Sequence, residues 1–178
     1  MNYIQGIARP TTEAAPATPV PAAAGGEGGP APGARPTVRG LPIVRPPYGA
    51  ITAIDLTKGE ILWQVAHGET PDNIRNNPAL KGVNVPRTGR AGNVGTITTA
   101  SLVISGEPGF ITNAQGQRGA YLRAYDKATG KDAGAAWMPA GETGAPMTYM
   151  YKGKQYIVLA IGGQGFPAEL IAFALPNS

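Results

Sequence analysis

The sequence contains no cysteine and a single histidine, His67. The lack of cysteine excludes disulfides, thiolate zinc sites and cysteine nucleophiles, and it leaves the redox compartment undetermined. With one histidine, neither a histidine-based metal cluster nor a Ser-His-Asp catalytic triad is expected. We expect His67 to be a hydrogen-bonded surface residue rather than a ligand.

Charge is also scarce, because only 15% of the 178 residues are charged, with 15 Lys and Arg against 11 Asp and Glu. The basic residues are too dilute for a nucleic-acid surface. The carboxylates form neither an Asp-x-Asp-x-Asp-Gly calcium loop nor a closely spaced acid/base pair. We therefore assign no catalytic residue and no metal ligand in this chain, and we expect no nucleic-acid partner.

Long apolar runs are missing as well. The N-terminus lacks the basic and apolar regions of a signal peptide, and no stretch approaches the roughly 18 apolar residues of a membrane span. We therefore expect no signal peptide in this chain.

Proline and glycine are abundant, with 18 and 26 residues respectively. Ten of the prolines lie in residues 1–47, together with a single aromatic residue, Tyr3. Such a composition cannot offset its ordering entropy, so residues 1–46 are expected to be a disordered Pro/Ala/Gly-rich linker. A polyproline ligand at Pro16–Pro19 is the alternative, although the segment fits the P-x-x-P pattern only loosely. Residues 47–178 then form the folded part.

Residues 47–178 read as an all-β domain, because short runs of strand-forming residues alternate with glycine-containing turns and no helical period persists. The run at 97–104 contains a small-residue break at Ala100-Ser101. The expected strands are 50–54, 61–65, 97–104, 121–125, 147–151, 155–161 and 170–175.

An internal repeat, Ala-x-Asp-x-x-x-Gly, occurs at residues 53–59 and 124–130. Its aspartates can cap hairpin turns, and a tryptophan follows each copy, Trp63 four residues after the first and Trp137 seven residues after the second. Repeated β-units of about 40–50 residues build β-propellers, in which a large flat side chain can pack between neighbouring blades. The three extra residues before Trp137 are expected to shift it out of the register of Trp63.

Residues 53–63 resemble the tryptophan-docking motif of the quinoprotein dehydrogenases, propeller enzymes that use pyrroloquinoline quinone (PQQ). Residues 144–149, 153–158 and 160–163 are similar to the last-blade signature of the glucose and alcohol dehydrogenases of that family. The resemblance covers residues 46–176. It implies a partial β-propeller of two to three blades, which is the C-terminal end of an eight-bladed domain.

The resemblance also implies PQQ and calcium as cofactors of the complete enzyme. The calcium ligands and the catalytic aspartate of the family lie in earlier blades and have no matching positions here. For this chain it implies that Asn93, Gly163 and Gln164 touch the rim of the quinone. A turn that merely enters the strand at Ile97 is the structural alternative for the glycine-rich segment 89–95.

The long polar stretch from His67 to Val94 has two interpretations. It can be a solvated loop between blades, or a docking surface for an electron acceptor such as a cytochrome, or for a missing part of the propeller.

Two functions follow from the resemblance and the repeats. One is the C-terminal portion of a PQQ-dependent dehydrogenase that oxidises an alcohol or an aldose, inactive as an isolated chain. Its partners would be the remaining blades and a cytochrome or quinone acceptor. It would be located in the periplasm or associated with a membrane. The alternative is a non-catalytic propeller-repeat scaffold or binding module.

Overall fold

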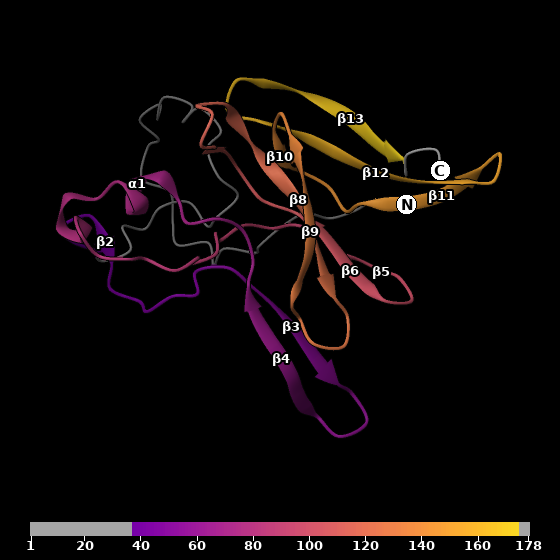
Figure 1. Cartoon of the computed structure of the whole chain (residues 1–178), viewed down its shortest axis with the longest axis horizontal. Coiled ribbons are helices and arrows are strands. Elements are labelled where there is room, and N and C mark those ends of the chain that lie inside the picture. The colour runs from indigo at the N-terminus through magenta and orange to yellow at the C-terminus, as the bar shows by residue number, and fades with distance from the viewer. Residues whose placement is uncertain (1–36, 175–178) are drawn as a thin grey trace, which may run out of the picture.

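The computed structural model describes residues 37–174, which form mostly antiparallel β-strands (Figure 1). The expected Pro16–Pro19 motif and most of the expected linker lie outside the described residues. Within residues 37–46, strands β1 (Thr37–Val38) and β2 (Leu41–Pro42) form a short hairpin. The amide Nδ2 of Asn77 donates to the carbonyl of Arg39 at the turn of this hairpin, at 3.1 Å.

Three further sheets follow one another along the chain and fan out in Figure 1. The first is the hairpin of β3 and β4, the second is built on β8, and the third is built on β12. The strands of these sheets are β3 (Ala50–Asp55), β4 (Glu60–Ala66), β5 (Ile97–Thr98), β6 (Leu102–Gly106), β7 (Ile111–Thr112), β8 (Arg118–Asp126), β9 (Asp132–Met138), β10 (Gly141–Glu142), β11 (Met147–Tyr151), β12 (Lys154–Gly163) and β13 (Phe166–Ala174).

The second sheet is four strands wide, because β6 and β7 lie end to end along one side of β8. β5 pairs with β6 at one edge, and β9 pairs with the other side of β8. In the third sheet β10 and β11 share one side of β12, and β13 covers the other. The described chain is therefore a partial β-propeller, in which a blade four strands wide lies between a two-stranded blade and a blade three strands wide.

Several elements differ from the sequence-based expectation. Five strands were not expected, and the longest of them is β9, whose small residues have little strand propensity and which forms by pairing with β8. The others are β1, β2, β7 and β10. Residues 97–104 are not one strand with a break, because the chain reverses direction at Thr99–Ser101 and β5 pairs back onto β6. The amide of Thr99 donates to the carbonyl of Leu102 at 2.8 Å, and its hydroxyl oxygen accepts from the amide of Leu102 at 3.0 Å. The small polar residues that looked like a break make this turn.

A further difference is a one-turn helix, α1 (Asp72–Arg75), which with the 3₁₀ turn η1 (Pro78–Leu80) lies in the long β4–β5 connection.

The hydrophobic core lies between the second and third sheets. It joins apolar side chains of β6, β8 and β9 to those of β12, and this burial is the main source of stability in such a structure. Its buried members are Ile104, Phe110, Ala120, Leu122, Met138, Ala140, Leu159 and Ile161.

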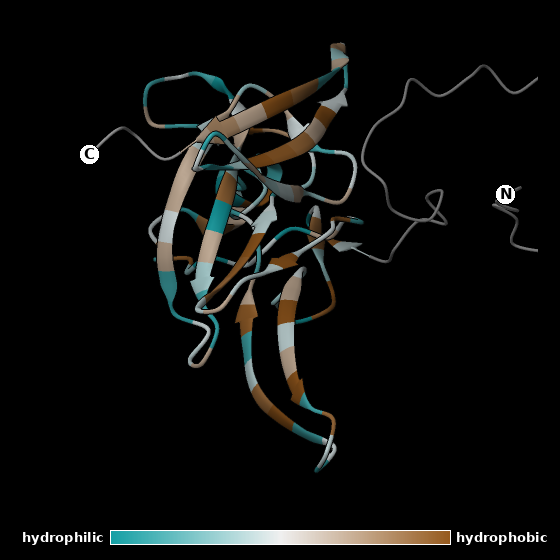
Figure 2. Ribbon diagram, turned by 90° about the vertical axis from the view of Figure 1, so that its right-hand side faces the viewer, coloured by the Kyte–Doolittle hydropathy of each residue, from teal (hydrophilic) through white to brown (hydrophobic). Residues whose placement is uncertain are grey.

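The β3–β4 hairpin, by contrast, carries apolar residues in both strands (Figure 2), and several of their side chains are exposed. Ile61 and Leu62 are more than half exposed, and Leu56 at the turn is 91% exposed. In the third sheet, Leu170 on the edge strand β13 is 76% exposed. Both outer sheets of the described chain thus present surface that a further strand or sheet would cover.

The repeated turns behave as expected, because in each the aspartate side chain accepts hydrogen bonds from backbone amides. Asp55 Oδ1 accepts from Thr57 at 2.9 Å, and Asp126 Oδ1 accepts from Thr129 at 2.8 Å. The glycine four residues after each aspartate has a positive φ, 72° at Gly59 and 71° at Gly130.

Trp63 connects the first sheet to the second repeat. Its indole Nε1 donates to the carbonyl of Lys127 at 2.9 Å, and its ring lies against Gly130. Trp137 instead pairs with Tyr121 of its own sheet, and the two rings meet edge to face at 4.8 Å. Trp63 pairs with Ala53 and thus lies three residues nearer to its turn than Trp137, which agrees with the three extra residues in the second copy.

The two turn glycines provide a matched pair of variants. A Cβ at Gly130 would lie 2.7 Å from ring atoms of Trp63, whereas nothing lies within 4 Å of one at Gly59. Because both residues have the same positive φ, Gly59→Ala reports backbone strain alone, about 1 kcal/mol. We expect Gly130→Ala to cost about 2 kcal/mol more, since the indole must move. Denaturant midpoints measure both, and equal losses would contradict the contact.

Candidate functional site

The connections between strands divide into two groups at opposite ends of the sheets, because successive strands are antiparallel. One end carries the connections that link sheets and the turn between β12 and β13. We call this end the loop face, and it comprises residues 67–96, 113–117, 139–140 and 163–165. The other end, the turn face, comprises residues 56–59, 99–101, 127–131 and 152–153.

Asn93, Gly163 and Gln164 all lie at the loop face and are exposed. Asn93 belongs to the β4–β5 connection, which leads into β5, an edge strand of the second sheet. Gly163 ends β12, and Gln164 follows it in the turn to β13. The topology thus places the three residues at one end of the molecule, in two separate connections.

Arg118, which the sequence analysis did not single out, holds the Gln164 turn. Its guanidinium Nη2 donates to the carbonyl of Gln164 at 3.2 Å and to the side-chain Oε1 at 2.9 Å. The guanidinium also lies over the ring of Phe110, 3.5 Å from the centroid. These contacts join the second and third sheets, hold Gln164 at a positive φ of 47°, and leave its amide Nε2 available as a donor.

The segment that carries Asn93 is held by close backbone packing on both sides. A Cβ at Gly92 would lie 2.3 Å from Pro108, and a Cβ at Gly95 would lie 2.4 Å from the Cα of Ala145. Only glycine fits these two positions without movement of the neighbouring chain. The glycine-rich sequence therefore has a packing reason here, because it lets the connection approach the second and third sheets.

A buried ring of hydrogen bonds lies behind this segment and joins all three sheets. The carboxylate of Glu142 accepts from the amide of Gly95 at 2.6 Å and from the amide of Gly106 at 2.5 Å. The hydroxyl of Ser105 donates to the carbonyl of Gly95 at 2.7 Å. The ring closes through His67, whose Nε2 lies 3.0 Å from the carbonyl of Gly106 and 3.4 Å from the Ser105 hydroxyl.

His67 was expected at the surface, and this is wrong, since its side chain is only 3% exposed. The expected hydrogen bonding is present. Nε2 can only donate to the Gly106 carbonyl, so Nδ1 accepts from the hydroxyl of Tyr125 at 2.9 Å. Burial lowers the pKa of His67. The hydrogen bond to Gly106 acts to raise this pKa, and the positive charge of the nearby Arg123 acts to lower it further. The imidazole is neutral and fastens the first sheet to the second.

A second polar cluster, buried at Arg123 and Glu107, ties the β4–β5 connection to β8. Arg123 donates from Nε to Glu107 and from Nη2 to Glu69, and Arg75 also donates to Glu69. Glu107 is 1% exposed, and its burial raises the pKa of its carboxyl against the opposing effect of Arg123. Removal of one partner from such a pair leaves an uncompensated buried charge.

The β4–β5 connection is solvated along much of its length, but parts of it are buried. Thr70, Thr88 and Arg90 within it are buried, and Arg87 makes a bidentate ion pair with Asp132 of β9 at 2.7 and 2.9 Å. Arg87, Glu69 and Asp72 thus bond to the second sheet, and they hold the connection against it.

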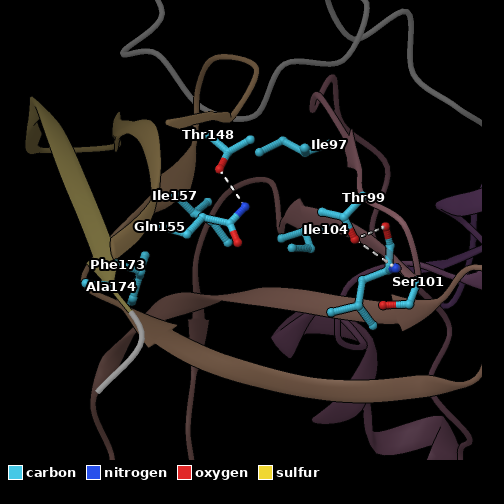
Figure 3. A pocket seen from close by; sticks show the side chains of 10 residues that line it. Ile97, Thr99, Ser101, Ile104, Thr148, Gln155, Ile157, Phe173 and Ala174 are labelled. Carbon is cyan, nitrogen blue, oxygen red and sulfur yellow. Dashed lines mark hydrogen bonds between the residues drawn. The ribbon is translucent and has the colours of Figure 1, made fainter. Parts of the chain in front are cut away.

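Between the second and third sheets, at the turn face, lies an apolar cleft of about 320 Å³ (Figure 3). Ile97, Ile104, Ile157 and Phe173 contribute its apolar wall, and Gln155 donates to the hydroxyl of Thr148 at its edge at 3.0 Å. Its lining includes Thr99 and Ser101 of the turn face, so it is separate from the Asn93 and Gln164 connections.

Within residues 37–174, no group of three or more His, Cys, Asp and Glu side chains is arranged to hold a metal ion. None of the helices described there is long and apolar enough to cross a membrane.

Comparison with known proteins gives a consistent family assignment. Residues 12–157 match the family model for the β-propeller domain of PQQ-dependent glucose, ethanol and alcohol dehydrogenases. This match begins inside the segment expected to be a linker.

Curated relatives agree with the family match. The chain is 36% identical over 147 residues to quinoprotein glucose dehydrogenase A of Acinetobacter calcoaceticus. It is 34% identical over 149 residues to a probable quinate dehydrogenase (quinone) of Xanthomonas campestris pv. juglandis, and 35% identical over 145 residues to the glycerol dehydrogenase large subunit of Gluconobacter oxydans. Each alignment covers 78% of this chain but only 17–18% of the relative.

Proposed function

Because the chain belongs to the glucose/ethanol/alcohol dehydrogenase family of PQQ β-propellers, we propose that it supplies the C-terminal blades of a PQQ-dependent dehydrogenase. The substrate would be an alcohol or an aldose. The remaining blades would complete the propeller, and a cytochrome or quinone would take the electrons. By analogy with the family, the enzyme would work in the periplasm or at its membrane, with calcium held by residues outside the described part.

The observation that carries this proposal is the common placement of Asn93, Gly163 and Gln164 at the loop face of a partial propeller. When bound, PQQ supplies the redox chemistry, since its quinone accepts the electrons of the oxidised alcohol. PQQ also carries carboxylates, so its edge requires hydrogen-bond donors.

The donors at the loop face fit that requirement. The amide groups of Asn93 and Gln164 can each donate to a carboxylate or quinone oxygen. The guanidinium of Arg118, which orients Gln164, adds a positive charge beside the turn. In this role the chain binds and orients one edge of the cofactor.

A segment exchange tests the proposal. The matching segment of the Acinetobacter calcoaceticus glucose dehydrogenase is replaced by that of this chain, and glucose-dependent dye reduction is measured with PQQ and Ca²⁺. We expect PQQ-dependent activity in this segment-exchange enzyme. We expect none in a control that lacks the segment, nor in the isolated 178-residue chain.

A segment-exchange enzyme that folds and yet fails to oxidise glucose with PQQ would overturn the proposal. It would favour the alternative function, a non-catalytic propeller-repeat scaffold. Turnover of an alcohol or sugar by the isolated chain would contradict the proposal that the remaining blades supply part of the active site.

A further inference from the structure

Glu142 occupies an unusual position for a carboxylate. It lies in β10, is 4% exposed, and accepts hydrogen bonds from the backbone amide of Gly95 in the β4–β5 connection and from that of Gly106 at the end of β6. From this geometry we propose that Glu142 is a positioning residue. It fixes the connection that carries Asn93 against the third sheet, and so sets the position of the Asn93 side chain at the loop face. The functional part of this inference rests on the function proposed above.

The contact reaches Asn93 through a short and rigid path. Gly95 is two residues from Asn93, and both of its backbone polar groups are bound, the amide by Glu142 and the carbonyl by Ser105. On its other side Gly95 packs against Ala145. The backbone is therefore fixed at Gly95, while Asn93 is exposed at the loop face.

Only an ionised carboxylate makes both bonds well. Two backbone N–H groups point at its two oxygens, and both oxygens of a carboxylate accept. A glutamine presents its amide nitrogen, a donor, to one of the two N–H groups and loses that bond, and a protonated glutamic acid offers only a weaker acceptor at its hydroxyl oxygen. A Cβ at Gly106 would lie 2.6 Å from Oε2 of Glu142, so the backbone approaches the carboxylate closely there as well.

The surroundings make this carboxylate sensitive to pH. Burial raises the pKa of Glu142 to about 7, although the bonds from Gly106 and Gly95 act in the opposite direction. The ionisable side chains on the packed elements are His67, which bonds to the Gly106 carbonyl, and Glu107, which is paired with Arg123. The amide of Glu142 itself donates to the carbonyl of Glu107 at 3.0 Å.

Ionisation of Glu142 thus has two separate consequences. It completes the two hydrogen bonds and orders the Asn93 connection. Because the folded-state pKa lies above the ordinary value of 4.5, it also removes the contribution of Glu142 to the free energy of unfolding, which is fully present below about pH 4.5 and is lost as the pH rises through about 7.

Amide NMR of the full 178-residue chain tests the positioning contact without any cofactor. We expect the Gly95 and Gly106 amide protons to titrate together with a midpoint near pH 7, shifting downfield as the carboxylate ionises. The titration should vanish in Glu142→Gln and persist in Glu169→Gln, which removes an exposed carboxylate of the same sheet. Wild-type amides that show no common titration would overturn the proposal, even if Glu142→Gln does not fold.

PQQ titration of the segment-exchange enzyme tests the functional part. At pH 8 we expect Glu142→Gln to weaken PQQ binding about tenfold, with no effect of Glu169→Gln. Combined with Asn93→Ala, Glu142→Gln should add little further loss, because both act through the same contact. Unchanged PQQ affinity in Glu142→Gln, or fully additive losses, would contradict the positioning role.

The two tests distinguish a wrong positioning role from a wrong proposed function. If the proposed function is wrong, the unmodified segment-exchange enzyme does not bind PQQ, whereas the NMR titration of the Gly95 and Gly106 amides still reports on Glu142.

Discussion

Replacement of Trp63 by alanine is expected to lower the free energy of unfolding by about 3 kcal/mol, the lower end of the range for large aromatic side chains, since Trp63 is partly exposed. The loss has two sources. The indole packs against Gly130, and its Nε1 donates to the carbonyl of Lys127 at 2.9 Å. Both contacts join the first sheet to the second, so the variant should release the β3–β4 hairpin.

Trp137→Ala is the matched control for this prediction. The ring of Trp137 contacts Tyr121 and Gly119 within its own sheet, so its removal leaves the junction between sheets intact. We expect a loss at least 1 kcal/mol smaller than that of Trp63→Ala. Denaturant midpoints of the full chain decide the comparison, together with amide exchange of β3 and β4. Equal losses, or a larger loss for Trp137→Ala, would contradict the assigned role of Trp63.

Local patterns in the sequence predicted most of the strands. The alternating runs at 50–54 and 61–65 became β3 and β4, and the aspartate and glycine of each repeat formed the expected capped turns. These features depend on residues close together in the chain, and their chemistry is visible in the sequence. The reversal at Thr99–Ser101 was missed because small polar residues suit both a break in a strand and a tight turn.

The buried polar contacts could not be predicted, because they join residues far apart in the chain. His67 meets Tyr125 across 58 positions, and Gly95 meets Glu142 across 47. A lone histidine or glutamate gives no local sign that it will be buried. Arg118 was missed for the same reason, since its partner Gln164 lies 46 positions away. Gly92 and Gly95 were the only sequence signal for these contacts. They indicated a glycine-rich loop, but not the close packing that the structure shows.

The central claim is that Asn93 and Gln164 bind the quinone from the loop face. Its most direct test is PQQ titration of the segment-exchange enzyme, with Asn93→Ala and Gln164→Ala compared with Lys58→Ala, which changes an exposed residue of the turn face. Each lost hydrogen bond to a charged group costs about 1.5–3 kcal/mol, so each loop-face variant should bind PQQ at least tenfold more weakly. Lys58→Ala should bind PQQ as the unmodified enzyme does. Equal PQQ affinity in all three variants would contradict the claim.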